Sequence, residues 1–120
     1  MKIIVTSQGA DMESEIDQRF ARARCLIEVD LETGEHEVVD NTQNLEAMQG
    51  AGVQAAQNVV ARGVEAVLTG HCGPKAFRVL QTAGVKICVG LDGKVSAAVA
   101  GYKAGDIQPT AEADVEGHWV

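Results

Sequence analysis

The stretch LTGHCGPKAF places a histidine and a cysteine, His71 and Cys72, between two glycines and directly before a proline. Gly70 and Gly73 would allow positive φ and a close approach of the backbone to a ligand. Pro74 suits the first position of a helix, where exposed amides and the helix dipole favour an anion. The stretch therefore predicts an anion-binding turn at the start of a helix, with His71 and Cys72 as candidate metal ligands.

His71 and Cys72 leave several chemical interpretations open. Glycine-bounded turns before a helix are common, so the stretch could be only a turn. One histidine beside one cysteine is a weak metal signal, because closed metal sites usually use four ligands. Cys72 would gain thiolate character from a helix N-terminus and could act as a nucleophile or redox thiol. A cysteine hydrolase also needs a base held by a third group, and a histidine adjacent in sequence rarely has that geometry.

Composition and charge disfavour other classes of function. Ten basic and 17 acidic residues among 120 give a net charge of −7, which argues against nucleic acid and against an anionic membrane surface as partners. A metal-dependent phosphohydrolase or nuclease would want carboxylates in or just beyond the central strands. The apolar run KIIVT has none, and the run VEAVLT contributes only Glu65 at its start.

The cysteines and the N-terminus indicate where the protein resides. Cys25, Cys72 and Cys88 are an odd number without a CxxC pair, so neither a disulfide framework nor a CxxC-type zinc site is indicated. Free thiols fit a reducing compartment. The N-terminal apolar run is too short for a signal peptide, and no later segment has the length that a bilayer requires. We therefore expect a cytoplasmic protein.

The hydrophobic pattern predicts a single domain of alternating strands and helices. With 46% hydrophobic and only 3% aromatic residues, the core must be built from Val, Ile, Leu and Ala. Short apolar, β-branched runs predict five strands, at residues 2–6, 24–30, 35–40, 64–69 and 85–90. Apolar residues at helical spacing predict helices at residues 45–62, 74–83 and from 95 to near Gly105, with a short helical turn around Glu15–Ala21.

This order of elements predicts an α/β fold with a mixed five-stranded sheet flanked by helices. A strand, a crossover helix and a second strand require parallel pairing with a right-handed crossover, so the first and the last two strands should be parallel. The segment LETG, with Gly34 at a left-handed position, predicts that the other two strands form a hairpin at one edge. Residues 106–120 show no clear period and are expected to form a C-terminal tail that could dock through Trp119.

Ligands of open α/β sheets bind beyond the carboxyl ends of the parallel strands. Three segments of this chain would converge there, Thr6–Gly9, Thr69–Gly73 and Gly90–Leu91. The basic residues that could accompany them are Arg19, Arg22, Arg24, Lys75 and Arg78. An anion site is compatible with the negative net charge, because the local field decides binding.

The motifs together resemble one known family. Across residues 1–105, the chain resembles the dinitrogenase iron–molybdenum cofactor biosynthesis family in the stretches KIIV, IDQRFARA, VVDN and GVEAVLTGHCGPKAFRVLQTAGVKICVG. The Arg19-Phe20 pair matches the family's Arg-Phe, and Ala21 stands where the family often has glycine. The family's Gly-x-x-Gly-Pro-x-Ala-Phe stretch is matched by Gly70, Gly73, Pro74, Ala76 and Phe77.

The resemblance implies a ribonuclease H-like topology and non-covalent binding of an anionic metal–sulfur cluster, of the molybdenum–copper sulfide or the iron–molybdenum type. We therefore expect residues 1–105 to form a cluster-binding domain that holds or carries such a cluster and that could serve a recipient protein. The expected cofactor-binding residues are Ser7, Gln8, Gly9, Arg19, Phe20, Arg22, Thr69, Gly70, His71, Cys72, Gly73, Pro74 and Lys75. Two other functions stay open, a thiol enzyme or redox protein using Cys72 and a ligand-free interaction module acting through the Trp119 tail.

Overall fold

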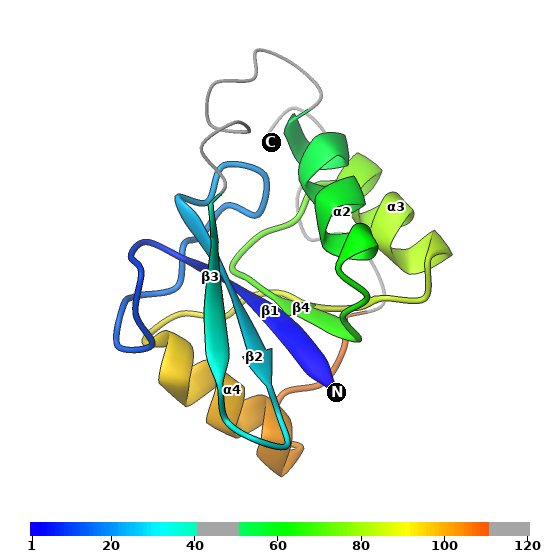
Figure 1. Cartoon of the computed structure of the whole chain (residues 1–120). Coiled ribbons are helices and arrows are strands. Elements are labelled where there is room, and N and C mark those ends of the chain that lie inside the picture. Colours follow the sequence, from blue (N-terminus) through cyan, green and yellow to red (C-terminus); the bar gives the residue numbers. More distant parts are fainter. Residues whose placement is uncertain (41–50, 111–120) are drawn as a thin grey trace.

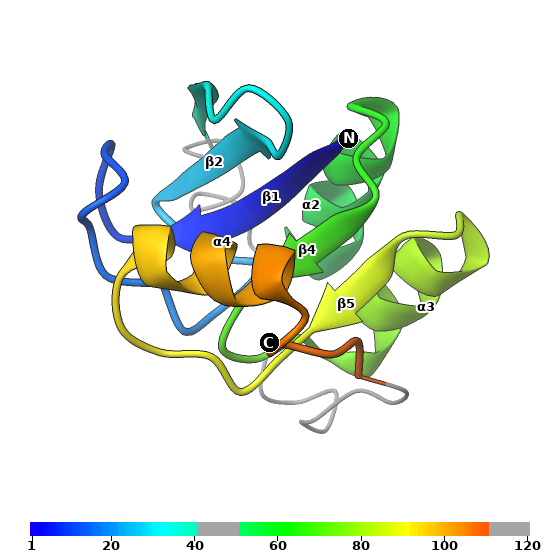
Figure 2. The same cartoon turned by 90° about the horizontal axis from the view of Figure 1, so that it is seen from below.

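The computed structural model describes residues 1–40 and 51–110, which form a mixed five-stranded sheet in the order β3-β2-β1-β4-β5. The strands are β1 (Lys2–Ser7), β2 (Cys25–Asp30), β3 (His36–Asp40), β4 (Ala66–Leu68) and β5 (Lys86–Cys88). The helices are α2 (Ala51–Ala61), α3 (Pro74–Thr82) and α4 (Val95–Ala104). Figures 1 and 2 show α2 and α3 on one face of the sheet and α4 on the other. The predicted α/β fold, with five strands and flanking helices, is confirmed.

The strand pairing follows the predicted topology. β1 pairs antiparallel with β2 and parallel with β4, which in turn pairs parallel with β5. β2 and β3 form the hairpin at one edge, and Gly34 in its turn has a φ of 79°. Because β1, β4 and β5 are parallel, their carboxyl ends meet at one end of the sheet, which we call the carboxyl edge.

β1 is buried on both faces of the sheet. Ile4 packs in the core cluster beneath α2 and α3, whereas Ile3 and Val5 pack in the cluster beneath α4. All three side chains are fully buried. Burial on both faces explains why the strand is a continuous apolar run rather than an alternation of apolar and polar residues.

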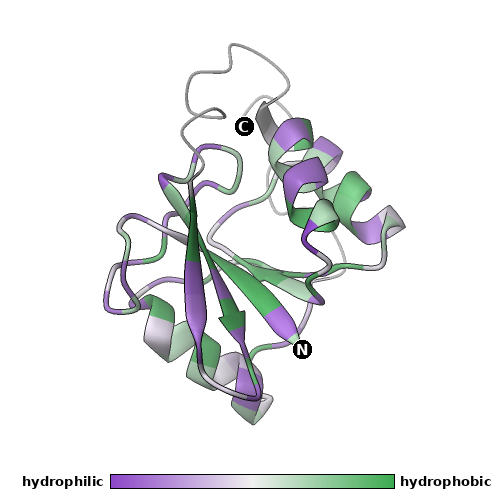
Figure 3. Ribbon diagram, in the orientation of Figure 1, coloured by the Kyte–Doolittle hydropathy of each residue, from purple (hydrophilic) through white to green (hydrophobic). Residues whose placement is uncertain are grey.

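α2 and α3 pack closely because the residues between them are small. A Cβ added at Gly52 of α2 would lie 3.5 Å from the Ala76 Cβ of α3 and 3.7 Å from the Ala21 Cβ. The apolar side of each helix faces the sheet and the polar side faces outward (Figure 3). Of the helix predicted at residues 45–62, the part at Ala51–Ala61 is confirmed, and residues 45–50 lie outside the described residues.

The helical turn expected around Glu15–Ala21 is wrong. The segment forms isolated β-bridges and bends instead. Its backbone bonds to distant parts of the chain, since the Ile16 amide donates to the Gly93 carbonyl at 2.8 Å and the Asp17 amide to the Thr6 carbonyl at 3.0 Å. Amides that are used in this way cannot form the i to i−4 ladder of a helix.

The residues after α4 run back along the outer edge of β5. Gly105 ends the helix in the left-handed conformation, with a φ of 84°. Ile107 then packs against the core cluster beneath α4. The Thr110 amide donates to the Ile87 carbonyl at 2.6 Å, and the Thr110 hydroxyl accepts from the Val89 amide at 3.2 Å. We call the segment from Ile107 to Thr110 the C-terminal strap.

Two further expectations concern the tail and the membrane. Trp119, through which the tail could dock, lies outside the described residues. Within residues 1–40 and 51–110, no helix is long and apolar enough to cross a bilayer.

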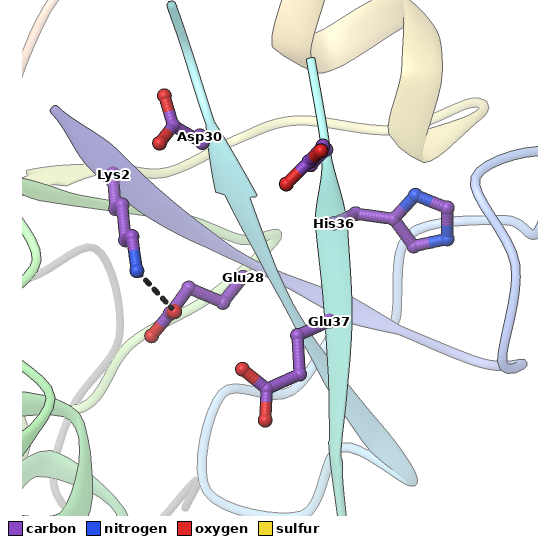
Figure 4. Close-up of a pocket in the computed structure, with 6 residues that line it drawn as sticks. Lys2, Glu28, Asp30, His36 and Glu37 are labelled. Carbon is purple, nitrogen blue, oxygen red and sulfur yellow. Dashed lines mark ion pairs between the residues drawn. The ribbon is translucent and has the colours of Figure 1, made fainter. Parts of the chain in front are cut away.

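An ion-pair network lies at the end of the sheet opposite the carboxyl edge. The Glu28 side chain is only 6% exposed, and its Oε1 accepts from the Arg62 Nε at 2.7 Å. The Lys2 Nζ lies 3.6 Å from Oε2 of the same carboxylate, and Arg62 Nη2 lies 3.1 Å from the Glu37 Oε2. The hydrogen bond to Glu28 raises the pKa of Arg62. Figure 4 shows these carboxylates around a hollow of about 130 Å³, with His36 pointing away from them.

Arg62 follows α2, so this network fixes the end of that helix to the β2–β3 hairpin. We predict that Arg62→Ala lowers the free energy of unfolding by about 1.5–3 kcal/mol, because Glu28 loses a charged hydrogen-bond donor while remaining buried. Urea unfolding of the full chain measures this. The matched control is Lys94→Ala, which removes an exposed ion pair to Glu13 with a 3.7 Å separation, where we expect roughly 0–1 kcal/mol. Equal losses in the two variants would contradict the prediction.

Candidate functional site

Buried hydroxyl groups join the ends of β1 and β4 at the carboxyl edge. The Thr6 hydroxyl is hydrogen-bonded to the Thr69 hydroxyl and to the Asp17 carbonyl oxygen, each at 2.8 Å. Both threonine side chains are fully buried. The Thr69 amide also donates to the Cys88 carbonyl of β5 at 3.0 Å. The three parallel strands are therefore held in register where their loops begin.

The arginine-containing segment 17–24 lies against the loop after β4. Arg19 and His71 form a parallel β-bridge, and the Phe20 amide donates to the His71 carbonyl at 3.1 Å. The Asp17 carboxylate accepts from two amides of the same segment, that of Arg19 at 3.1 Å and that of Arg24 at 3.2 Å. We call residues 17–24 the arginine loop.

The loop after β5 contacts both the loop after β4 and the arginine loop. The Gly90 amide donates to the Gly70 carbonyl at 2.7 Å, and the Leu91 amide donates to the Thr69 carbonyl at 3.3 Å. The Gln18 side-chain amide donates to the Leu91 carbonyl at 3.1 Å, so the arginine loop contacts this loop as well. The segments that were expected to converge after β4 and β5 do so.

The segment after β1 is bonded to itself and to residues 14–16. The Ser7 hydroxyl donates to the Gly9 carbonyl at 2.7 Å and accepts from the Gly9 amide at 3.2 Å. The Gln8 amide donates to the Glu15 carbonyl at 2.9 Å, and a Cβ on Gly9 would meet the Ser14 side chain. These bonds hold Ser7–Gly9 against residues 14–16, toward α4.

The two glycines of the opening motif differ in how closely the rest of the chain approaches them. Neither Gly70 nor Gly73 has a positive φ, so the left-handed conformation that glycine allows is used at neither position. A Cβ on Gly70 would lie 2.8 Å from the Cα of Gln18. Gly70 is therefore required for close packing against the arginine loop, and Gly73 has ordinary extended angles, with φ −72° and ψ 164°.

The start of α3 is an anion-binding geometry. Gly73 is the N-cap and has no side chain with which to cap the helix, and Pro74 has no amide hydrogen. The first intrahelical bond runs from the Phe77 amide to the Gly73 carbonyl, at 2.9 Å. The amides of Lys75 and Ala76 precede it, so helix geometry leaves them without an intrahelical acceptor. Such amides, together with the helix dipole, favour an anion.

The start of α4 differs from that of α3, although both lie near the carboxyl edge. Its first amides already have acceptors, since Val95 donates to the Ser14 carbonyl at 2.9 Å and Ser96 to the Met12 carbonyl at 2.8 Å. The chain itself therefore occupies the positions that an anion would take at α4. The start of α3 is the better candidate for a ligand.

Several positively charged residues lie in α3 and in the adjoining arginine loop. Arg19, Arg24, Lys75 and Arg78 are exposed, and Arg22 is half-buried. They come from the arginine loop and from the first two turns of α3. This local concentration of cations contrasts with the net charge of −7 and favours an anionic ligand.

The predicted site residues divide by burial. Those with exposed or partly exposed surface are Gln8, Gly9, Arg19, Arg22, His71, Pro74 and Lys75. The buried ones are Ser7, Phe20, Thr69, Gly70, Cys72 and Gly73. The buried side chains pack in the protein interior and support the loops of the site. In particular, Phe20 and Cys72 belong to the core cluster beneath α2 and α3.

Two of the three thiols, those of Cys72 and Cys88, are buried and poorly placed for reaction. Cys72 is fully buried, and its thiol donates a long hydrogen bond to the Gly73 carbonyl, at 3.8 Å. Burial raises the pKa of the Cys88 thiol to about 11. In the described part of the chain, no three His, Cys, Asp or Glu side chains are grouped as metal ligands. Helix geometry supplies backbone amide donors at the start of α3, and cationic residues lie on the adjoining segments.

Sequence reasoning missed two residues of this edge, Asp17 and Gln18. Asp17 carried a recognisable signal, because an aspartate often bonds the amide two residues further along the chain in a turn. Gln18 carried none, since its contacts with Gly70 and Leu91 depend on how the loops meet.

Comparison with known proteins identifies the family of this chain. Residues 1–105 match the family described as dinitrogenase iron-molybdenum cofactor. The chain is similar to the apo form of the orange protein from Desulfovibrio gigas, with 36% identity, a TM-score of 0.92, and coverage of 95% of this chain and 96% of that one. It is also similar to a candidate NifB protein from Thermotoga, with 33% identity, a TM-score of 0.79, and coverage of 95% and 98%.

A more distant relative is an uncharacterised protein from Methanocaldococcus jannaschii, which is 29% identical over 75 residues. That match spans 60% of this chain and 63% of the relative, which is less than two thirds of its length. The family match, by contrast, covers the whole sheet, α2, α3 and α4. This chain belongs to the dinitrogenase iron–molybdenum cofactor family.

Proposed function

We propose that the chain binds or carries an anionic metal–sulfur cluster at the carboxyl edge, without obligatory covalent ligation. One observation carries the proposal: the start of α3, with no side chain at its N-cap, lies beside the arginine loop that is bonded to His71. Family membership and the similarity to the orange protein support a role connected with metal clusters.

The available donors suit such a ligand. A thiomolybdate-type cluster is large, soft and negatively charged, and its sulfides can accept several hydrogen bonds at once. The amides of Lys75 and Ala76 would supply directional donors, and Arg19 and Arg22 would supply charge. A cluster held in this way can be released again, which suits transfer to a recipient protein.

The burial of Cys72 supports this function over a thiol enzyme. A nucleophilic or redox thiol must reach its substrate, and Cys72 is fully buried in the core beneath α2 and α3. The thiol is then a packing group, and the cluster is held by the donors above it.

Metal and sulfide analysis tests the proposed function directly. The full chain, purified anaerobically, is incubated with tetrathiomolybdate with and without Cu(I), desalted and analysed together with its visible spectrum. We expect stoichiometric molybdenum and sulfide with charge-transfer bands, and the copper content distinguishes a molybdenum–copper sulfide from other clusters. Failure to retain either metal under both conditions would contradict the proposal.

Charge reversal tests the arginine loop. We predict that Arg19→Glu weakens tetrathiomolybdate binding at least tenfold, about 1.4 kcal/mol, because an exposed cation beside the start of α3 becomes an anion. Arg22→Glu should act in the same direction. Titration followed by visible absorption measures the change.

The matched control for these variants is Lys103→Glu, the same reversal in the last turn of α4. It should change the affinity less than twofold. If Lys103→Glu weakens binding as much as Arg19→Glu, only the net charge matters and the arginine loop is not part of the site.

Cysteine substitution tests direct ligation. We predict that Cys72→Ala keeps the bound molybdenum and the colour, at a stability cost of about 1 kcal/mol that is typical of a core substitution. Cys88→Ala, which alters a buried thiol in the other core cluster, is the control. Loss of colour in Cys72→Ala alone would establish a thiolate bond. Rapid alkylation of Cys72 in the metal-free native protein would instead favour the thiol enzyme.

A further inference from the structure

Asp17 is fixed to the end of β1 through its backbone. Its amide donates to the Thr6 carbonyl at 3.0 Å, and its carbonyl is hydrogen-bonded to the buried Thr6 hydroxyl at 2.8 Å. Thr6 is itself bonded to Thr69 of the loop after β4. Asp17 is therefore attached to the buried threonine pair at the carboxyl edge.

The Asp17 side chain fixes the arginine loop at two points. Oδ1 accepts from the Arg19 amide at 3.1 Å, and Oδ2 accepts from the Arg24 amide at 3.2 Å. One carboxylate thus joins the beginning and the end of the loop, with Phe20 and Arg22 between them. Its oxygens accept from backbone amides of the loop.

The negative charge of Asp17 and its two hydrogen bonds predict opposite effects on the binding of an anion. A carboxylate beside an anion site repels the ligand, so Asp17 weakens binding if its charge is its main effect. Its two hydrogen bonds act in the opposite direction, since they hold the loop that carries Arg19 and Arg22 beside His71. If Asp17 strengthens the binding of an anion, it therefore cannot do so by direct electrostatic attraction.

We propose that Asp17 is a positioning residue, which holds the arginine loop in the conformation that presents Arg19 and Arg22 to an anionic thiometallate at the start of α3. The inference rests on the proposed function. In this proposal Asp17 does not contact the ligand. It changes the affinity only by holding Arg19 and Arg22 in place.

The direction of one affinity change tests the proposal. Asp17→Asn removes the repelling charge, keeps one acceptor oxygen and puts an NH2 group where the other amide must donate. We expect tetrathiomolybdate to bind the full-length variant at least fivefold more weakly than the unaltered chain, and Asp17→Ala, which loses both acceptors, more weakly still. Unchanged or tighter binding by both variants would overturn the proposal, because the charge would then be the main effect.

Asp30 provides matched controls at the opposite end of the sheet. Its carboxylate also accepts from two backbone amides, those of Glu32 at 2.9 Å and Thr33 at 3.3 Å. Asp30→Asn and Asp30→Ala should therefore change tetrathiomolybdate affinity less than twofold, whatever they do to stability. Urea unfolding of all four variants shows which are folded under the titration conditions, and Asp17→Asn, the mildest change, is the variant on which the test depends.

A double-mutant cycle distinguishes positioning from general destabilisation. If Asp17 acts through Arg19, then Arg19→Ala should cost much less affinity in the Asp17→Asn background than in the unaltered chain. Additive losses would overturn the proposal. No binding by the unaltered chain would overturn the proposed function and this inference together. Weaker binding by Arg19→Ala without any effect of Asp17→Asn would overturn this inference alone.

Discussion

The burial of β1 on both faces is the constraint on which the rest of the structure depends. Ile4 is needed beneath α2 and α3, while Ile3 and Val5 are needed beneath α4, so the strand must be central and its neighbours fill both sides. Its antiparallel partner begins the hairpin and its parallel partner leads to α3. The position of one short apolar run therefore decides which loops meet at the carboxyl edge.

Small side chains make this arrangement compact. With so few aromatic residues, the layers are filled by alanine and branched aliphatic residues, and Gly52 brings α2 within contact distance of Ala76. Phe20 is an exception, since it extends from the arginine loop into the core beneath α2 and α3. The loop that carries the cations is thus anchored by an apolar side chain as well as by hydrogen bonds.

Several cations of this acidic chain lie in the arginine loop and the first turns of α3. The carboxyl edge carries Arg19, Lys75 and Arg78, whereas the opposite end gathers Glu28 and Glu37 around Arg62. A chain with a negative net charge can therefore still gather several cations in adjoining segments. The buried Glu28 carboxylate at the opposite end is paired with Arg62 and Lys2, which lie outside the arginine loop.

The fold was predictable from local patterns, and part of the site was not. The β-branched runs, the LETG turn and Gly105 each specify one element, and parallel pairing then predicts that the loops after β4 and β5 converge. The path of residues 15–21 could not be predicted, because its amides bond to Thr6 and Gly93, which are distant in sequence. The burial of Cys72 was also hidden, since nothing in a glycine-bounded turn shows which side chain points inward.

The C-terminal strap has a consequence for the limits of the folding unit. The family match ends at residue 105, but the Ile87 carbonyl and the Val89 amide of β5 are paired with Thr110. A chain cut at the end of the match would expose the outer hydrogen-bonding groups of an edge strand, which is the surface through which sheets aggregate. The strap pairs these groups, so the chain that completes the edge of the sheet extends to Thr110, beyond the family match.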